Sequence, residues 1–181
     1  MGARYEIRFS GSGGQGMILA GIVMAEAASI FSDKNAVQSQ SYGPESRGGA
    51  SKAEVIISNE PIDYPKATAI DCMLALTQQA CTKYHGDIKD DGMLIIDSDE
   101  VTDVPEGAFK VISLPILETA RKDLGKIIVA NIISLGVMTE LTGVVSNEAM
   151  ENAVLSRVPK PFLELNKKAL QKGFSMARDQ K

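Results

Sequence analysis

The sequence predicts an α/β fold: a three-layer α/β/α sandwich around a mostly parallel sheet that contains one antiparallel hairpin element. Three observations predict it. Short runs with strand character are separated by longer runs with helical spacing, so the two kinds of element alternate along the chain. A strand pattern near the N-terminus passes through a glycine-rich turn into a helix pattern. One pair of strands is joined by a loop too short for a crossover helix, which makes that pair antiparallel.

The size and composition fit a single globular domain over residues 1–181. Hydrophobic residues make up 44% and charged residues 23% of the 181, which is ordinary for a globular domain. The net charge of −4 and an aromatic content of 5% argue against a nucleic-acid partner. The start of the chain leads into a strand without a signal-peptide pattern, and no apolar run is long enough to span a bilayer. We therefore expect a cytoplasmic location and no membrane partner.

The first strand and helix follow from two different periodicities. Tyr5, Ile7 and Phe9 alternate with Glu6 and Arg8, which predicts a strand over 4–10. Apolar residues at helical spacing predict a helix from residue 17 to about residue 30. Four glycines lie in the six residues between the two elements, Gly11–Gly16.

The middle of the chain supplies the other strands. We predict a hairpin of strands 36–42 and 51–58, joined by the loop Gly43–Ala50, which has proline and paired glycines. Apolar runs bounded by polar residues predict buried strands over 70–76, 93–97 and 109–114. Thr77 is placed to cap a helix over 78–85. Residues 86–92 are polar and are predicted to be a connection, and residues 98–107 are acidic and predicted to be exposed.

The C-terminal part is predicted to be helical. Pro115 begins a short helix that ends near Gly125. Residues 127–141 are apolar almost all round, which predicts a buried helix. Ser146 opens another helix, and an amphipathic helix follows Pro159 over residues 162–176.

The glycine-rich turn is the first candidate site. Glycine permits a close approach to the main chain, and the following helix points its free N–H groups and positive dipole end toward the turn, which favours an anion. Gly11, Gly13 and Gly16 match the G-x-G-x-x-G pattern of dinucleotide-binding folds, so the sandwich is Rossmann-like. No carboxylate ends the second strand to hold a ribose, so this is not an ordinary NAD site. The alternative is a tight turn that binds nothing. The candidate cofactor-binding residues are Gly11, Ser12, Gly13, Gly14, Gln15 and Gly16.

The hairpin loop is the second candidate site. Arg47, beside two glycines, can present its guanidinium to a carboxylate or phosphate with little hindrance. The alternative is an exposed hairpin tip in which an Arg47–Glu45 pair is worth little. Because ligands collect outside the carboxyl ends of strands in open α/β sheets, we expect both loops at one edge of the domain. The candidate residues for a partner or a substrate are Gly43, Glu45, Ser46, Arg47, Gly48 and Gly49.

The chain lacks a complete catalytic set. Its two cysteines, Cys72 and Cys81, have the spacing of neither a zinc site nor an iron–sulfur run, and Cys72 is predicted to be a buried thiol. His85 is the single histidine, which is predicted to lie at a helix end, so neither a Ser/His/Asp set nor a metal site is expected. The glycine-rich turn is not followed by the Lys-Ser/Thr of a P-loop. We predict no catalytic residue and no metal ligand in this chain.

The combination of the two loops resembles a known family. Gly11–Gly16 followed by Ser41-Tyr42-Gly43-Pro44-Glu45-Ser46-Arg47-Gly48-Gly49 is similar to the gamma subunit of the 2-oxoacid:ferredoxin oxidoreductases. The same domain is fused into single-chain pyruvate:ferredoxin oxidoreductase. The resemblance continues through Glu60–Pro65, Asp71, Asn131 with Gly136, and Asn166 with Ala169. It covers the chain from Arg4 to about Gly173.

The resemblance implies a non-catalytic subunit of an oxidoreductase complex. Such complexes convert a 2-oxoacid, coenzyme A and oxidised ferredoxin into acyl-coenzyme A, CO₂ and reduced ferredoxin. They use thiamine diphosphate, magnesium and iron–sulfur clusters carried by alpha, beta and delta partners, and the gamma domain is associated with coenzyme A access. By this resemblance the chain binds no cofactor tightly, is inactive alone and works with alpha, beta and delta subunits and ferredoxin.

Three alternatives remain open at this point. The form Ser-Tyr-Gly-Pro-Glu-x-Arg-Gly-Gly resembles both 2-oxoglutarate and branched-chain 2-oxoacid types, and we favour 2-oxoglutarate. The smaller subunit of indolepyruvate:ferredoxin oxidoreductase shares the domain. A free-standing nucleotide- or coenzyme A-binding module is the hypothesis that the glycine pattern alone supports.

Overall fold

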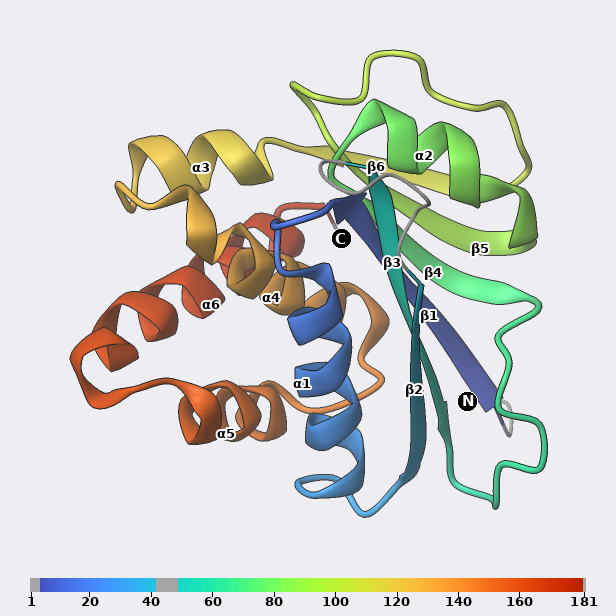
Figure 1. Cartoon of the computed structure of the whole chain (residues 1–181), viewed down its shortest axis with the longest axis horizontal. Coiled ribbons are helices and arrows are strands. Elements are labelled where there is room, and N and C mark those ends of the chain that lie inside the picture. Colours follow the sequence, from blue (N-terminus) through green and yellow to red (C-terminus); the bar gives the residue numbers. More distant parts are fainter. Residues whose placement is uncertain (1–3, 42–48, 181) are drawn as a thin grey trace.

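A six-stranded sheet forms the centre of the described structure (Figure 1). The computed structural model describes residues 4–41 and 49–180. The strands lie in the order β2-β3-β1-β4-β5-β6. Their bounds are β1 Arg4–Ser12, β2 Asn35–Ser41, β3 Ala50–Ser58, β4 Ile70–Ala75, β5 Ile88–Asp97 and β6 Lys110–Leu114. β3 is antiparallel to both β1 and β2, whereas β1, β4, β5 and β6 pair in parallel. The predicted mostly parallel sheet with an antiparallel hairpin is confirmed.

Helices cover both faces of the sheet unequally. On one face lie α1, α3, α4, α5 and α6, whereas α2 lies on the other (Figure 1). The bounds are α1 Met17–Ser29, α2 Gln78–Tyr84, α3 Ile116–Lys122, α4 Ala130–Thr142, α5 Asn147–Arg157 and α6 Leu163–Arg178. Short 3₁₀ turns, η1 His85–Asp87, η2 Ile127–Val129 and η3 Lys160–Phe162, precede β5, α4 and α6. The three-layer prediction is confirmed. We call the layer of α1, α3, α4, α5 and α6 the thick layer and the layer formed by α2 the thin layer.

Each layer has its own apolar core. The larger core lies under α1 and α4 and contains Ile7 and Phe9 of β1 with Cys72 of β4. The smaller core lies under α2 and contains Met73 and Cys81. Consecutive residues of a strand point to opposite faces, which is why Cys72 and Met73 belong to different cores.

Two glycines bring α4 and α6 into main-chain contact. A Cβ atom added to Gly136 would lie 2.4 Å from the carbonyl oxygen of Leu170, and one added to Gly173 would lie 2.2 Å from that of Ile133. Side chains at either position would push the helices apart, because a main-chain carbonyl cannot rotate away as a side chain can. This crossing fixes α6 against the helix predicted over 127–141, which forms as η2 and α4. The prediction that this whole helix is buried is wrong at its start, where Ile127 and Ile128 are 50% and 63% exposed.

Two predicted boundaries are wrong. Residues 88–92 belong to β5, where Ile88 pairs with Ile70, and are not part of the predicted connection 86–92. Asp90 and Asp91 are exposed, and backbone pairing at exposed positions leaves no apolar pattern in the sequence. Gly11 and Ser12 belong to β1, not to the turn, because they pair with Ser51 and Ala50. None of the helices described in residues 4–41 and 49–180 is both long and apolar enough to cross a bilayer.

Candidate functional site

The glycine-rich turn closes on itself through Gln15. The Gln15 side-chain Oε1 accepts a hydrogen bond from the Ser12 N–H at 2.7 Å, and the Gln15 N–H donates to the Ser12 carbonyl at 3.2 Å. A Cβ atom at Gly11 would lie 2.4 Å from Gln15 Oε1. Gly11 therefore makes room for the Gln15 side chain, which folds back over the end of β1 and holds the turn.

The last residue of the turn joins it to α4. Gly16 is the N-cap residue of α1 and has a φ of 77°, a left-handed conformation that favours glycine. A Cβ atom there would lie 2.5 Å from the Nδ2 atom of Asn131, the second residue of α4. Asn131 is 5% exposed. The turn is thus supported from below by a buried amide that lies 115 positions away along the chain.

The start of α1 is open to an anion. Among the described side chains none caps its first turn, and that turn contains no acidic residue. Gly13 and Gly14, which lead into the helix, are exposed. Uncapped N–H groups and the positive end of a 13-residue helix favour a negatively charged group at this position.

The two predicted loops meet at one edge as far as the structure describes them. The Gly13 N–H donates to the Gly49 carbonyl at 3.1 Å, directly beyond the last β1–β3 pair, Ser12 and Ala50. The Ser51 hydroxyl donates to the Gly11 carbonyl at 3.4 Å. The predicted loop residues Gly43, Glu45, Ser46, Arg47 and Gly48 lie outside the described residues. Gly49, the end of that loop, is in contact with the glycine-rich turn.

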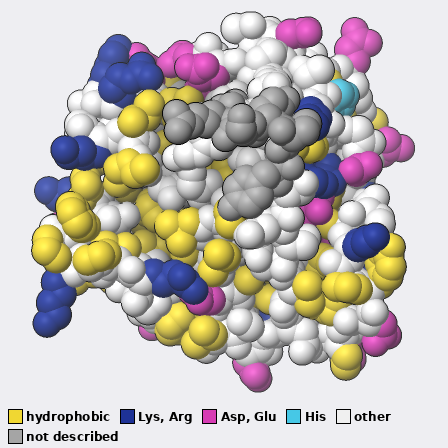
Figure 2. Space-filling model, in the orientation of Figure 1, with side chains coloured by type: hydrophobic (Ala, Val, Ile, Leu, Met, Phe, Trp, Pro, Cys, Tyr) yellow, Lys and Arg dark blue, Asp and Glu magenta, His cyan; other side chains and the backbone are white. Residues whose placement is uncertain are grey.

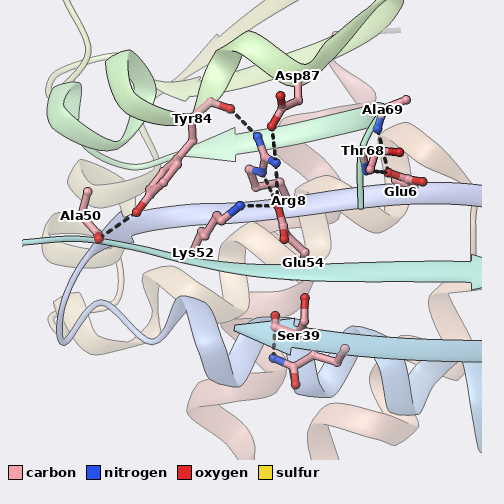
Figure 3. A network of polar contacts seen from close by, with 11 residues as sticks. Glu6, Arg8, Ser39, Ala50, Lys52, Glu54, Thr68, Ala69, Tyr84 and Asp87 are labelled. Atoms are coloured by element: carbon pink, nitrogen blue, oxygen red, sulfur yellow. Dashed lines mark hydrogen bonds and ion pairs between the residues drawn. The ribbon is translucent and has the colours of Figure 1, made fainter. Parts of the chain in front are cut away.

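A buried ion network supports this edge from the α2 side (Figure 3). The Arg8 side chain is 1% exposed and donates to Glu54 at 2.6 and 2.8 Å, to Asp87 at 2.7 Å and to the Tyr84 carbonyl at 2.5 Å. Lys52 also donates to Glu54, at 2.7 Å. Two carboxylates and a carbonyl therefore hold the Arg8 guanidinium, and removing Glu54, the more buried carboxylate, would leave the half-exposed Asp87 as the remaining counter-charge, at a cost of about 2 kcal/mol or more.

Tyr84 carries this support to the loop. Its hydroxyl donates to the Ala50 carbonyl at 3.0 Å, and its ring lies under the ammonium group of Lys52, 5.5 Å from the ring centre. Ala50 follows Gly49, so the Arg8 network, Tyr84 and the two loops are linked by direct contacts. Sequence reasoning did not single out Tyr84, Glu54 or Lys52. Tyr84 closes the helix that follows Thr77, and only the fold brings it to Ala50.

The two thiols do not fit an iron–sulfur cluster. Cys72 Sγ lies 3.6 Å from the sulfur of Met138 in the larger core, while Cys81 lies in the smaller core on the opposite face of the sheet. Burial raises the pKa of both thiols, that of Cys81 to about 11. Within residues 4–41 and 49–180, no three His, Cys, Asp or Glu side chains gather as a metal site would require. His85 lies at the C-terminal end of α2, as predicted, with Nδ1 near the Cys81 and Thr82 carbonyls.

Comparison with known proteins identifies the family. The family described as pyruvate ferredoxin/flavodoxin oxidoreductase matches residues 6–176. The chain belongs to this family. A 2-oxoglutarate synthase subunit KorC from Methanocaldococcus jannaschii is 49% identical over 97% of the chain and 95% of the relative. The resemblance found in the two loops is therefore confirmed over most of the chain, residues 6–176.

Solved structures share the fold. The gamma subunit of a keto/oxoacid ferredoxin oxidoreductase from Geobacter sulfurreducens is 61% identical, with a TM-score of 0.91 over 97% of both chains. A 2-oxoglutarate:ferredoxin oxidoreductase from Magnetococcus marinus, with 2-oxoglutarate, coenzyme A and succinyl-CoA bound, has a TM-score of 0.86 at 22% identity. This chain matches 32% of that longer one, which shows that the fold occurs both as a separate chain and as part of a larger one.

Proposed function

We propose that this chain is the gamma subunit of a 2-oxoglutarate:ferredoxin oxidoreductase. The observation that carries the proposal is the match to relatives of the same length: 49% identity with a 2-oxoglutarate synthase subunit and 61% with an oxoacid ferredoxin oxidoreductase gamma subunit, each over at least 95% of both chains. The complex decarboxylates 2-oxoglutarate oxidatively, transfers the acyl group to coenzyme A and passes electrons to ferredoxin.

The chemistry of this reaction belongs to other subunits of the complex. Decarboxylation of a 2-oxoacid needs thiamine diphosphate with magnesium, and electron transfer needs iron–sulfur clusters. Cys72 and Cys81 lie on opposite faces of the sheet, so these two thiols do not ligate one cluster. The alpha and beta subunits, together with a delta subunit, supply these groups, and the gamma subunit alone is inactive.

The edge formed by the glycine-rich turn is the contribution of this chain. Exposed Gly13 and Gly14 in front of the uncapped α1 fit the diphosphate of coenzyme A or a carboxylate of a partner subunit. Gly49 lies against Gly13, and Arg47, which precedes Gly49 by two residues in the sequence, is the residue that we propose adds a guanidinium to the same anion. The role is to receive or orient an anionic group beside the catalytic subunits.

Assembly and activity of the complex test this proposal. Co-expressed with the other subunits of its oxidoreductase, the chain should purify with them, and the complex should reduce ferredoxin or a viologen dye only when 2-oxoglutarate and coenzyme A are present. Pyruvate and 2-oxoisovalerate are the matched substrates and should react at least about tenfold more slowly. An Arg47→Ala complex should raise the KM for coenzyme A while it still assembles.

Failure has distinct forms. A chain that purifies without oxidoreductase subunits contradicts the proposal. A complex that prefers 2-oxoisovalerate contradicts the substrate assignment alone. Unchanged coenzyme A kinetics in the Arg47→Ala complex would remove Arg47 from the site. A thermal shift of the isolated chain with NAD or FAD would favour a free-standing nucleotide-binding module.

A further inference from the structure

An apolar groove lies beside the glycine-rich turn on the thick helical layer. It has a volume of about 530 Å³ and runs between the first turns of α1, the start of α4, the end of α5 and the start of α6. Val23, Val129, Ile132, Val158 and Leu165 are among the residues that line it. Figure 2 shows apolar side chains gathered on this side of the molecule, with basic side chains along their outer border.

The rim of the groove exposes large apolar side chains. Ile128 is 63% exposed, Phe162 54% and Leu19 41%, and all three line the groove. A small molecule seated in the groove would cover its floor but leave these rim side chains in water. A protein surface covers floor and rim together, and contiguous exposed apolar side chains of this kind mark protein contacts.

A buried amide at the inner end of the groove lacks a partner. Asn131 lines the groove and is 5% exposed, yet its side chain forms no hydrogen bond with the described residues. Among the described residues Thr139 Oγ1 is the buried side-chain polar atom without a partner, so water still reaches the Asn131 amide in the free chain. A surface that covers the groove displaces this water and must offer the amide a donor or acceptor in its place. Its contact with Gly16 places that outside group next to the glycine-rich turn.

The charges around the groove favour an acidic partner over a second copy. Lys126 and Arg157 line the groove, and no carboxylate does among the described residues. Because Glu26 pairs with Arg157, Lys126 is the lining cation that would attract a carboxylate of a partner. Lys160 adds a second positive charge nearby, since it lies in η3 between the lining residues Pro159 and Phe162. A two-fold contact with a second copy would bring like charges together, whereas a partner with a carboxylate beside its apolar side chains complements them.

We propose that this groove is the docking site of another subunit of the oxidoreductase, through a segment that presents apolar side chains next to a carboxylate and a main-chain group to Asn131. The inference rests on the proposed function. It places the partner's surface against the side of the glycine-rich turn, so that the anion-receiving edge lies at the contact between subunits.

Affinity measurements on groove variants test the inference. The ligand is the set of remaining subunits of the oxidoreductase, purified as a complex without this chain, and the readout is the Kd for the full-length chain. Ile128→Glu and Phe162→Glu should each raise Kd at least about tenfold, because docking would bury a charge in place of an apolar rim side chain. Val104→Glu is the control: Val104 is 40% exposed but lies in the loop that Gln78 of α2 holds on the opposite face.

Two further variants separate docking from folding. Asn131→Leu should leave the urea midpoint of the isolated chain unchanged or higher and still weaken binding, which a purely structural role would not do. Lys126→Glu should slow association and reduce its salt dependence.

Each outcome decides the inference. If the groove variants bind the remaining subunits with the same Kd as Val104→Glu, the docking inference is overturned and the proposed function is unaffected. A wild-type chain that does not bind the other subunits at all overturns both. A wild-type chain that dimerises, with Ile128→Glu monomeric and subunit binding unaffected, assigns the groove to a second copy and overturns it as well.

Discussion

The contact between Gly16 and Asn131 joins the two parts of the edge at the scale of single residues. Gly16 closes the glycine-rich turn, and Asn131 lies at the inner end of the apolar groove. The absence of a Cβ at Gly16 serves two ends, because the residue has a positive φ and the buried amide occupies the space that a side chain would need. A substitution at this residue therefore reports on both.

Alanine substitutions at two glycines separate these effects. Gly14 has a φ of 96° with no neighbour within 4 Å of an added Cβ, so Gly14→Ala should cost about 1 kcal/mol of unfolding free energy from backbone strain alone. Gly16→Ala should cost about 2 kcal/mol or more, because Asn131 must also leave its buried position. Urea denaturation measures both.

The double variant is the control. In an Asn131→Ala background most of the extra cost of Gly16→Ala should disappear, because the amide is gone and the residue 131 Cβ, 3.3 Å from the added methyl group, is the closest remaining atom of that side chain. If Gly14→Ala and Gly16→Ala lower the unfolding free energy of the wild-type chain equally, the Asn131 side chain moves aside without an energetic cost.

The residues of the turn were predictable and its supports were not. Four glycines between a strand pattern and a helix pattern can be recognised locally, since the signal lies within consecutive residues. The supports Asn131 and Tyr84 come from helices that are distant in the sequence, and each reaches the turn or Ala50 only through tertiary packing. The family resemblance indicated Asn131 without indicating what it touches.

At the scale of elements, the α4–α6 crossing positions one wall of the groove. Phe162 and Leu165 stand at the start of α6, and the crossing at Gly136 and Gly173 sets how close α6 comes to α4. The sequence predicted both helices because their apolar patterns are long. It did not predict their close contact, since a glycine inside a helix pattern gives no indication of what lies against it.

Gly136→Ala tests the crossing. Alanine should gain about 1 kcal/mol in helix propensity, but its Cβ would meet the Leu170 carbonyl at 2.4 Å, and the net effect should be a loss of about 2 kcal/mol or more. Gly86→Ala, where an added Cβ has no neighbour within 4 Å, should change the unfolding free energy by no more than about 0.5 kcal/mol. A Gly136→Ala chain as stable as Gly86→Ala would mean that the helices separate without cost.

The strand β1 illustrates a different limit of sequence reasoning. Its alternation correctly placed Ile7 and Phe9 on one face and Glu6 and Arg8 on the other. Arg8 is nonetheless 1% exposed and Glu6 4%, because Glu54 and Asp87 pair with the first and the main chain of Thr68 and Ala69 donates to the second. Periodicity indicates the face of a polar residue, whereas its burial depends on partners from other elements.

At the scale of the whole molecule, the unequal layers imply unequal stability. The larger core lies under five helices, whereas the smaller core is covered by the two turns of α2 and the loop after β5. Each core contains one cysteine, Cys72 in the larger and Cys81 in the smaller. The two thiols therefore report separately on the opening of each layer.

Thiol labelling across urea and pH is the corresponding experiment. Burial, and to a smaller extent the nearby Asp103 carboxylate, raise the pKa of Cys81 from 9.0 to about 11, so at pH 8 about one native Cys81 in a thousand is a thiolate. Burial also raises the pKa of Cys72. Native chain should therefore react slowly with iodoacetamide, and mass spectrometry should find Cys81 labelled at a lower urea concentration than Cys72. Simultaneous labelling of both would show that the two layers unfold as one cooperative unit.

The pH dependence has a defined sign. The folded pKa of Cys81 exceeds the unfolded one, so between pH 9 and about 11 the unfolded chain has released its thiol proton while the native chain retains it. The unfolded state is favoured as the pH rises through this interval, and the unfolding free energy should fall there. In a Cys81→Ser variant the part of this decline that comes from the Cys81 thiol should be absent, because a serine hydroxyl does not ionise in this pH range. If the unfolding free energy of the variant falls as steeply above pH 9 as that of the wild type, the decline comes from groups other than Cys81. If Cys72 of the variant is still labelled slowly by iodoacetamide, the larger core stays closed while α2 opens.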